Sequence, residues 1–163
     1  MSAAVGIDAA VLKDALSRFT TGVTVVTTSH EGQDFGMTCN SFNSVSLDPP
    51  VVLWSIRQSS QAHAAFVGSG GYVVNVLAAP QKDVAMKFTQ GSHNERFEGV
   101  PTQRSATQKP LLTQALAWFE CDLLQAIPVG DHTIMLGKVT ACGAQAGQGL
   151  AYSQRAFGVM QAL

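Results

Sequence analysis

Short runs of β-branched residues, separated by turn-forming residues, are the feature that most limits the fold of this chain. TTGVTVVTT, residues 20–28, is followed by SHEGQDFG, and together they predict a strand that leads into a hairpin turn. The partner strand is expected over 37–47 and ends at Asp48-Pro49-Pro50, because proline cannot donate to a sheet ladder. Further strands are expected over VVLWSI (51–56), YVVNVL (72–77), Leu116 to Leu124 and, beyond the turn PVGDH, TIMLGKVTAC.

The helices expected between these strands are short and few. Asp8 can cap the first, whose apolar residues recur at helical spacing and should pack on the outside of a sheet. Ser59-Ser60 resembles the N-cap of a second helix, QAHAAFV, and Pro80 can open a third, QKDVAMKFTQ. Residues 91–110 are interpreted as a polar loop and GAQAGQG as a turn. Because strands and long helices do not alternate, the pattern predicts a mainly β fold, a closed or nearly closed antiparallel barrel with a few helices.

Composition limits the partners of the chain. Its 163 residues fit one domain, expected over 1–163, since no linker divides the pattern. Only 13% of the residues are charged and 46% are hydrophobic, so part of the apolar surface is expected in a subunit interface. The net charge of −1 argues against nucleic acid as a partner. Three widely spaced cysteines favour a reducing cytoplasm, and neither a secretory leader nor a membrane-spanning segment is expected.

A candidate anion site follows the strand over 51–56. Arg57 lies just past that strand and two residues before Ser59-Ser60, so a guanidinium, hydroxyls and backbone N–H groups can converge as at a phosphate site. The alternative is a serine cap beside a surface arginine. Thr38, Asn40 and Ser41 lie on the preceding strand, where their amide and hydroxyl groups suit the ring edge and ribityl chain of a flavin.

Four segments, taken in order, resemble the successive blocks of the flavin reductase-like family. They are FTTGVTVVTT, GMTCNSFNSVSLDPPVVLWSIRQSS, YVVNVLAAPQ and ALAWFECDLLQAIPVGDHTIMLGKV. The members are short-chain NAD(P)H:flavin oxidoreductases that supply reduced flavin to two-component monooxygenases. The resemblance implies a split β-barrel of the FMN-binding type, an antiparallel Greek-key barrel with a few flanking helices. It also implies FMN or FAD as cofactor, NADH or NADPH as hydride donor, a homodimer and a partner monooxygenase.

Carried over by position, the resemblance assigns most of the candidate site to two short segments. It implies that the isoalloxazine and ribityl groups are contacted by Thr38, Asn40 and Ser41, and the flavin phosphate by Arg57, Ser59 and Ser60. Asn75 is a weaker candidate for the same pocket, with a buried asparagine that satisfies neighbouring backbone as the alternative. Arg96-Phe97 matches a loop that lies near the cofactor in this family, although a solvated arginine beside a packed phenylalanine explains it equally well.

One histidine is expected to take part in the reaction. Gly130-Asp131-His132 matches a family motif whose histidine lies close to the flavin and the nicotinamide, which implies a catalytic role for His132. An imidazole can hydrogen-bond either ligand near neutral pH. The alternative is that His132 only orders the hairpin turn with Asp131. No HExxH motif or carboxylate cluster accompanies the four histidines, so no metal site is expected.

Several choices stay open at the level of sequence. The tail GLAYSQRAFGVM departs from the family pattern, so no nicotinamide contact is assigned to Tyr152 or Arg155. FMN and FAD share the phosphate that Arg57 would hold, and nothing distinguishes NADH from NADPH. Two other functions are considered: a flavoprotein that reduces a corrinoid or ferric iron, and a non-enzymatic flavin- or haem-binding split-barrel protein.

Overall fold

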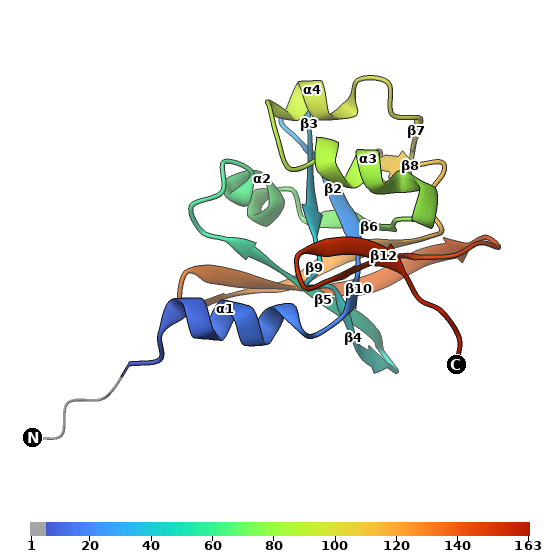
Figure 1. Ribbon diagram of the computed structural model, residues 1–163. Coiled ribbons are helices and arrows are strands. Elements are labelled where there is room, and N and C mark those ends of the chain that lie inside the picture. The colour runs from blue at the N-terminus through green and yellow to red at the C-terminus, as the bar shows by residue number, and fades with distance from the viewer. Residues whose placement is uncertain (1–5) are drawn as a thin grey trace, which may run out of the picture.

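Strands form most of the regular structure in residues 6–163, the part of the chain that the computed structural model describes (Figure 1). The helical elements are α1 (Ala9–Ser17), α2 (His63–Gly68), the 3-10 turn η1 (Ala79–Gln81), α3 (Lys82–Lys87) and α4 (His93–Phe97). The strands are β1 (Thr21–Gly22), β2 (Thr24–His30), β3 (Gln33–Cys39), β4 (Asn43–Leu47), β5 (Pro50–Arg57), β6 (Gly71–Val76), β7 (Thr102–Arg104), β8 (Pro110–Leu112), β9 (Ala117–Val129), β10 (His132–Ala144), β11 (Leu150–Ser153) and β12 (Ala156–Val159).

Seven strands form one antiparallel sheet in the order β3-β2-β6-β9-β10-β5-β4. Its two edge strands, β3 and β4, are consecutive in the chain and are joined by residues 40–42 alone. So short a connection requires the sheet to curl until its two edges approach each other. Within residues 6–163 no ladder joins β3 to β4, so the barrel is split at that edge. The predicted mainly β, antiparallel fold with a few flanking helices is confirmed.

The inside of the barrel is filled by large side chains from several elements. Trp54 of β5 is fully buried, with ring centroids 4.9 Å from Phe66 of α2 and 5.7 Å from Tyr72 of β6. The Tyr72 hydroxyl donates a hydrogen bond of 3.1 Å to the Met135 carbonyl of β10. Gly137 lies so close to that hydroxyl that a Cβ at this position would overlap it. The core therefore joins α2, β5, β6 and β10 around one tryptophan.

The segment expected as a single strand over 37–47 is two strands, because the chain bends at residues 40–42. Ser41 Oγ accepts a hydrogen bond of 2.9 Å from the Ser55 N–H and donates one of 3.3 Å to the Ser55 carbonyl, which ties the bend to β5. The hairpin before it is also tighter than expected. Glu31 and Gly32 adopt φ angles of 50° and 77°, so β3 already begins at Gln33.

The helix predictions differ from the structure in extent. The residues Ser59-Ser60 do not cap α2, which begins at His63 without any side-chain cap, and α3 ends at Lys87. The polar loop expected over 91–110 is wrong, since this segment contains α4 and β7 and ends at the first residue of β8. Helix α4 has a capping box in which Ser92 and Glu95 bond each other's backbone N–H, but five residues are too few to show a helical period.

Helix α1 begins where predicted but does not pack as predicted. Asp8 Oδ1 accepts a hydrogen bond of 2.7 Å from the Ala10 N–H, which confirms the cap. None of the residues of α1 is buried, and Val11, Leu16 and Phe19 are 65%, 64% and 78% exposed. The expectation that this helix packs on the outside of the sheet is therefore wrong within one chain. Its apolar stripe remains uncovered.

Other features bear on the compartment and on metals. No helix within residues 6–163 combines the length and the apolar character needed to cross a membrane. The sequence predicts no leader at the N-terminus. Residues 1–5, the first residues of that segment, lie outside the described part. Cys39, Cys121 and Cys142 are free thiols. In the same described part, no three histidine, cysteine or acidic side chains gather as metal ligands.

We expect the fold to lose stability in acid through Asp34 of β3. Partial burial alone would raise the pKa of Asp34. Hydrogen bonds from Arg104 and Ser29, together with the charge of Arg104, have the larger combined effect and hold this pKa below 3.8. A pKa lowered by folding stabilises the fold above the unfolded-state pKa, and this contribution disappears as the pH falls through the folded-state pKa. The free energy of unfolding should therefore drop between about pH 5 and about pH 2. The drop should be smaller in Arg104→Ala than in the wild type.

Urea unfolding at both pH values measures this difference. Arg18→Ala is the matched control, because Arg18 pairs with Asp14 on an exposed helix face and should leave the acid loss unchanged. An equal acid loss in Arg104→Ala and in the wild type would contradict the role of the pair.

Candidate functional site

The bend between β3 and β4 lies against the end of β5 and encloses a hollow of about 510 Å³, here called the central hollow. This size is within the usual range for small-molecule sites. Seven of the residues singled out in the sequence line it together: Thr38, Asn40, Ser41, Arg57, Ser59, Ser60 and His132. Segments far apart in sequence thus meet at one place on the surface.

Strand alternation explains why Arg57 faces this hollow. On β5, Trp54 and Ile56 point into the core, so Ser55 and Arg57 point to the opposite face. The antiparallel register places Arg57 directly opposite His132 of β10. Opposite residues on one face have Cβ atoms about 4.5 to 5.5 Å apart, so both side chains leave the sheet at the same place, and both line the central hollow.

The corner after β5 offers unpaired hydrogen-bond donors. The turn is fixed by Gln58, whose N–H donates 3.0 Å to the Asp131 carbonyl and whose side chain donates 3.1 Å to the His132 carbonyl. Within residues 6–163, the Arg57 guanidinium and the Ser59 hydroxyl have no hydrogen-bond partner, and the backbone N–H groups of Ser59 and Gln61 have no acceptor. A guanidinium, a hydroxyl and two backbone N–H groups form a set of donors that suits a phosphate.

Two of the predicted hydroxyl contacts are already used by the protein. Thr38 Oγ1 donates 2.6 Å to the Ala85 carbonyl of α3, and Ser41 Oγ is held by Ser55. The Thr38 N–H is engaged as well, since it donates 3.3 Å to the Phe88 carbonyl. The Asn40 amide has no hydrogen bond to another residue in the described chain, so it is the free polar side chain of this bend.

His132 is oriented by its neighbour in the turn. Its Nδ1 lies 2.7 Å from Asp131 Oδ1, and the hydrogen bond and charge of His132 lower the pKa of Asp131 below 3.8. The imidazole is 38% exposed at the edge of the central hollow. With Nδ1 engaged by the carboxylate, Nε2 is the nitrogen left to face a ligand.

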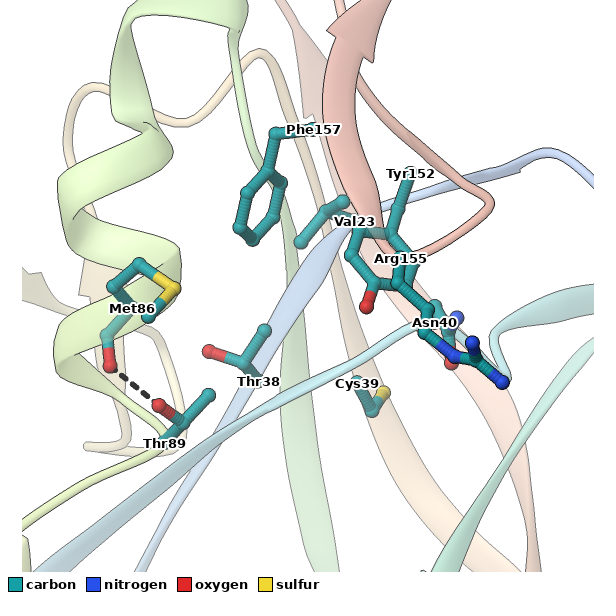
Figure 2. A pocket seen from close by; sticks show the side chains of 9 residues that line it. All are labelled: Val23, Thr38, Cys39, Asn40, Met86, Thr89, Tyr152, Arg155 and Phe157. Carbon is teal, nitrogen blue, oxygen red and sulfur yellow. Dashed lines mark hydrogen bonds between the residues drawn. The ribbon is translucent and has the colours of Figure 1, made fainter. Parts of the chain in front are cut away.

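Two further hollows adjoin the central one. The apolar hollow, about 420 Å³, lies between α3 and the hairpin β11–β12 and is lined by Val23, Met86, Tyr152 and Phe157 (Figure 2). Its rim carries Asn40 and Arg155, and the tyrosine and phenylalanine rings are 5.2 Å apart. The arginine hollow, about 610 Å³, lies against α4 and is lined by Arg57, Ser60, Gln61, Thr89, His93 and Arg96 among others. It shares Thr38 and Thr89 with the apolar hollow.

Three predicted residues lie away from the central hollow. Arg96 lines the arginine hollow, where Nη1 donates 2.8 Å to the Gly36 carbonyl. Phe97 packs edge-on against Phe88, with centroids 5.0 Å apart, and lines none of the three hollows. Asn75 is fully buried and holds the backbone of β2 and β8 together, which corresponds to the alternative considered for it in the sequence.

The hairpin β11–β12 is the part of the site that sequence reasoning missed. Gln154 and Arg155 form its turn with φ angles of 49° and 64°, a conformation usually left to glycine and asparagine. Because the turn carries neither, the run GLAYSQRAFGVM gives no hairpin signal. Tyr152 alternates with smaller residues, as in a strand, but the alternation covers too few residues to predict one.

Comparison with known proteins gives a consistent result. The family model described as "Flavin reductase like domain" matches residues 16–161. FMN reductase (NADH) SmoA of Agrobacterium fabrum is 41% identical over 146 residues, which are 90% of this chain and 83% of the relative. The reductase component of the flavin-dependent trigonelline monooxygenase of Acinetobacter baylyi is 41% identical over 147 residues, 90% of this chain.

The relatives differ in length from this chain. It spans 47% of the Acinetobacter protein, and 48% and 65% of two relatives from Rhizobium meliloti. Among solved structures, the NADH:FAD oxidoreductase SgcE6 of Streptomyces globisporus, in complex with NAD and FAD fragments, superposes with a TM-score of 0.89 at 34% identity. That match covers 94% of this chain and 93% of the other.

Proposed function

Because the chain belongs to the flavin reductase-like domain family, we propose that it is a single-domain NAD(P)H:flavin oxidoreductase that reduces FMN or FAD. The observation that carries this proposal is the meeting of Arg57, Ser59, Ser60, Asn40 and His132 around one hollow. Their donors fit a flavin: unpaired cationic and N–H groups for its phosphate, a free amide for its polar edge, and an adjoining apolar hollow for its ring. Relatives named for NADH support NADH as the hydride donor.

The residues of the chain act in this proposal by holding and orienting ligands. A bound flavin supplies the redox chemistry by accepting a hydride from the nicotinamide. The phosphate corner at Arg57 fixes one end of the flavin, and the bend at Asn40 fixes its polar edge. Tyr152 and Phe157 exclude water from the apolar hollow, and His132 Nε2 offers a hydrogen bond at the boundary. Positioning the two rings in contact, within about 3 to 3.5 Å, is the main contribution expected of the protein.

His132→Ala should weaken the reaction without abolishing it. Loss of one neutral hydrogen bond costs about 0.5 to 1.5 kcal/mol, so kcat/KM for NADH should fall roughly threefold to tenfold. Steady-state kinetics with saturating flavin measures this change. His63→Ala is a suitable control, because His63 bonds Thr133 and does not line the three hollows. Unaltered flavin affinity and unaltered turnover in His132→Ala would assign the histidine to the turn alone.

An assay of NADH oxidation with and without added free flavin tests the activity against the two other functions. A reductase that releases reduced flavin turns over continuously only when flavin is added. Continuous turnover that instead required a corrinoid or ferric iron would indicate a different acceptor. A protein that binds flavin but oxidises neither nicotinamide would be the non-enzymatic binder.

We also propose that the chain forms a homodimer through the exposed apolar stripe of α1. Val11 and Leu16 lie uncovered on this helix and Phe19 lies just beyond its end, which is more apolar surface than an isolated surface helix usually leaves in water. Phe19→Glu with Leu16→Glu should shift the protein towards monomer in light scattering. The control Lys13→Glu changes a polar residue on the same helix and should leave the mass unchanged.

A partner monooxygenase and a location in the cytoplasm complete the proposal. The partner is supported by the trigonelline monooxygenase reductase component among the relatives, and the compartment by three free thiols. Pull-down of an oxygenase with the purified reductase, or oxygenase activity that depends on it, would test the partnership.

A further inference from the structure

The bend between β3 and β4 places an exposed asparagine directly before a serine. The ladder of β3 ends at Cys39, so the backbone of Asn40 and Ser41 belongs to no sheet. Within residues 6–163, the Asn40 amide has no hydrogen bond and the Ser41 N–H donates to no oxygen or nitrogen. That N–H faces the Cys39 sulfur, which is a weak acceptor. An exposed amide, a small following residue and a weakly held backbone nitrogen are the conditions under which asparagine loses ammonia.

Deamidation at this bend is a reaction between two adjacent residues, so it needs no second molecule until its last step. The Ser41 nitrogen loses its proton to the solvent and attacks Asn40 Cγ. The new N–Cγ bond closes a five-membered succinimide ring, and the Cγ–Nδ2 bond breaks to release ammonia. Water then opens the ring at one of its two carbonyls and leaves aspartate or isoaspartate. The sum consumes one water and releases one ammonia, with no oxidation or reduction.

A second Asn-Ser pair three residues further along provides an internal comparison. Asn43 is also exposed, but it lies in β4, where Asn43 pairs with Leu53 and Ser44 with Val52. The side chains of an extended strand project away from the chain, so the Ser44 nitrogen is held apart from the Asn43 side chain. Ring closure there requires the ladder to open first. The two pairs have the same sequence and differ in their backbone surroundings.

Deamidation of Asn40 introduces a negative charge among cationic groups. Asn40 lines the central hollow together with Arg57, and it lines the rim of the apolar hollow together with Arg155 (Figure 2). None of the described residues that line these two hollows is acidic. A carboxylate at position 40 therefore attracts the free Arg57 guanidinium and repels a phosphate that approaches it.

We propose that Asn40 is a deamidation site of this chain, and that its conversion to aspartate or isoaspartate weakens the binding of flavins that carry a phosphate. The first half depends only on the bend between β3 and β4. The second half rests on the proposed flavin reductase function. Flavin affinity then falls as the protein ages, while the sheet stays intact.

Peptide mapping of the full chain after incubation in warm, mildly alkaline buffer tests the first half. Both asparagines lie in the tryptic peptide 19–57, and fragment ions assign the gain of one mass unit to Asn40 or Asn43. Asn40 should convert at least about tenfold faster than Asn43, because the ladder must open before Asn43 reacts. Equal rates at the two positions, or an Asn40 that does not convert while Asn43 does, would overturn the site. So would a protein in which neither asparagine converts.

Flavin titration of Asn40→Asp and Asn40→Ala tests the second half, since both variants remove the amide and only one adds a charge. Asn40→Asp should bind FMN about tenfold more weakly than Asn40→Ala, whereas riboflavin should bind the two variants within about threefold of each other. Asn43→Asp is the matched control and should leave both affinities unchanged, because Asn43 lines neither hollow.

The outcomes of these titrations distinguish the effect of deamidation from the flavin reductase function. Equal FMN affinities of Asn40→Asp and Asn40→Ala would overturn the effect of the charge and leave the flavin reductase function standing. Absence of flavin binding in the wild type would overturn the function and the effect of deamidation together. The site itself is decided by the mass measurement alone.

Discussion

Arg57→Ala is expected to weaken FMN or FAD binding by about 10- to 100-fold, since a charge-assisted hydrogen bond contributes about 1.5 to 3 kcal/mol. The guanidinium lies at the end of β5, opposite His132, and has no protein partner within residues 6–163. Its removal therefore costs ligand binding without leaving a buried group unpaired in the free protein. Flavin fluorescence quenching gives the dissociation constants directly.

Riboflavin is the most informative control for this variant, because it has the ring and the ribityl chain but no phosphate. Arg57→Ala should leave riboflavin affinity within about threefold of the wild type, since no charged group is lost from that complex. Arg57→Lys keeps the charge but not the planar fork, so its FMN affinity should be intermediate. An equal loss for riboflavin and FMN would show that Arg57 does not hold the phosphate.

Trp54→Ala is expected to lower the free energy of unfolding by about 3 to 5 kcal/mol, the usual cost of removing a large aromatic side chain from a core. Trp54 is fully buried and contacts Phe66 and Tyr72 edge-on, so the cavity would open between β5, α2 and β6. Because Ser55 and Arg57 lie on the same strand, the variant should also loosen the phosphate corner. Urea unfolding monitored by circular dichroism measures the change in stability.

Two control variants distinguish the loss of core volume at Trp54 from a general loss of stability on any substitution in β5. Trp54→Phe keeps an aromatic ring in the core and should recover more than half of the lost stability. Leu53→Ala changes the neighbouring, partly exposed residue on the opposite face of β5 and should cost less than Trp54→Ala. A Trp54→Ala protein as stable as the wild type would mean that the barrel core does not depend on this residue.

The strands and the centre of the site were predictable because local signals there agree with the tertiary structure. Arg57 follows a buried strand, and the alternation that puts Trp54 inside also puts Arg57 outside. The turn at Gly130 and Asp131 starts β10 at His132, and the regular ladder of β10 with β5 then pairs His132 with Arg57. Each of these facts depends on residues close together in the sequence or on one regular ladder.

The parts that could not be predicted depend on contacts distant in sequence. The break between β3 and β4 needs Ser41 to find Ser55, and the role of Asn75 needs Val25 and Leu112 as partners. Arg155 reaches the rim of the apolar hollow through a turn made without glycine. The exposed stripe of α1 has the same pattern as a buried one, since periodicity shows a face but not what covers it.

Anaerobic mixing of the purified protein with NADH and an excess of oxidised FAD or FMN is the most direct test of the central claim. We predict that the flavin absorbance bleaches in step with the loss of NADH, one flavin for each nicotinamide, at a rate that increases with enzyme concentration. The Arg57→Ala variant should need a higher flavin concentration to reach the same rate. Absence of bleaching with either flavin and with either nicotinamide dinucleotide would contradict the proposed function.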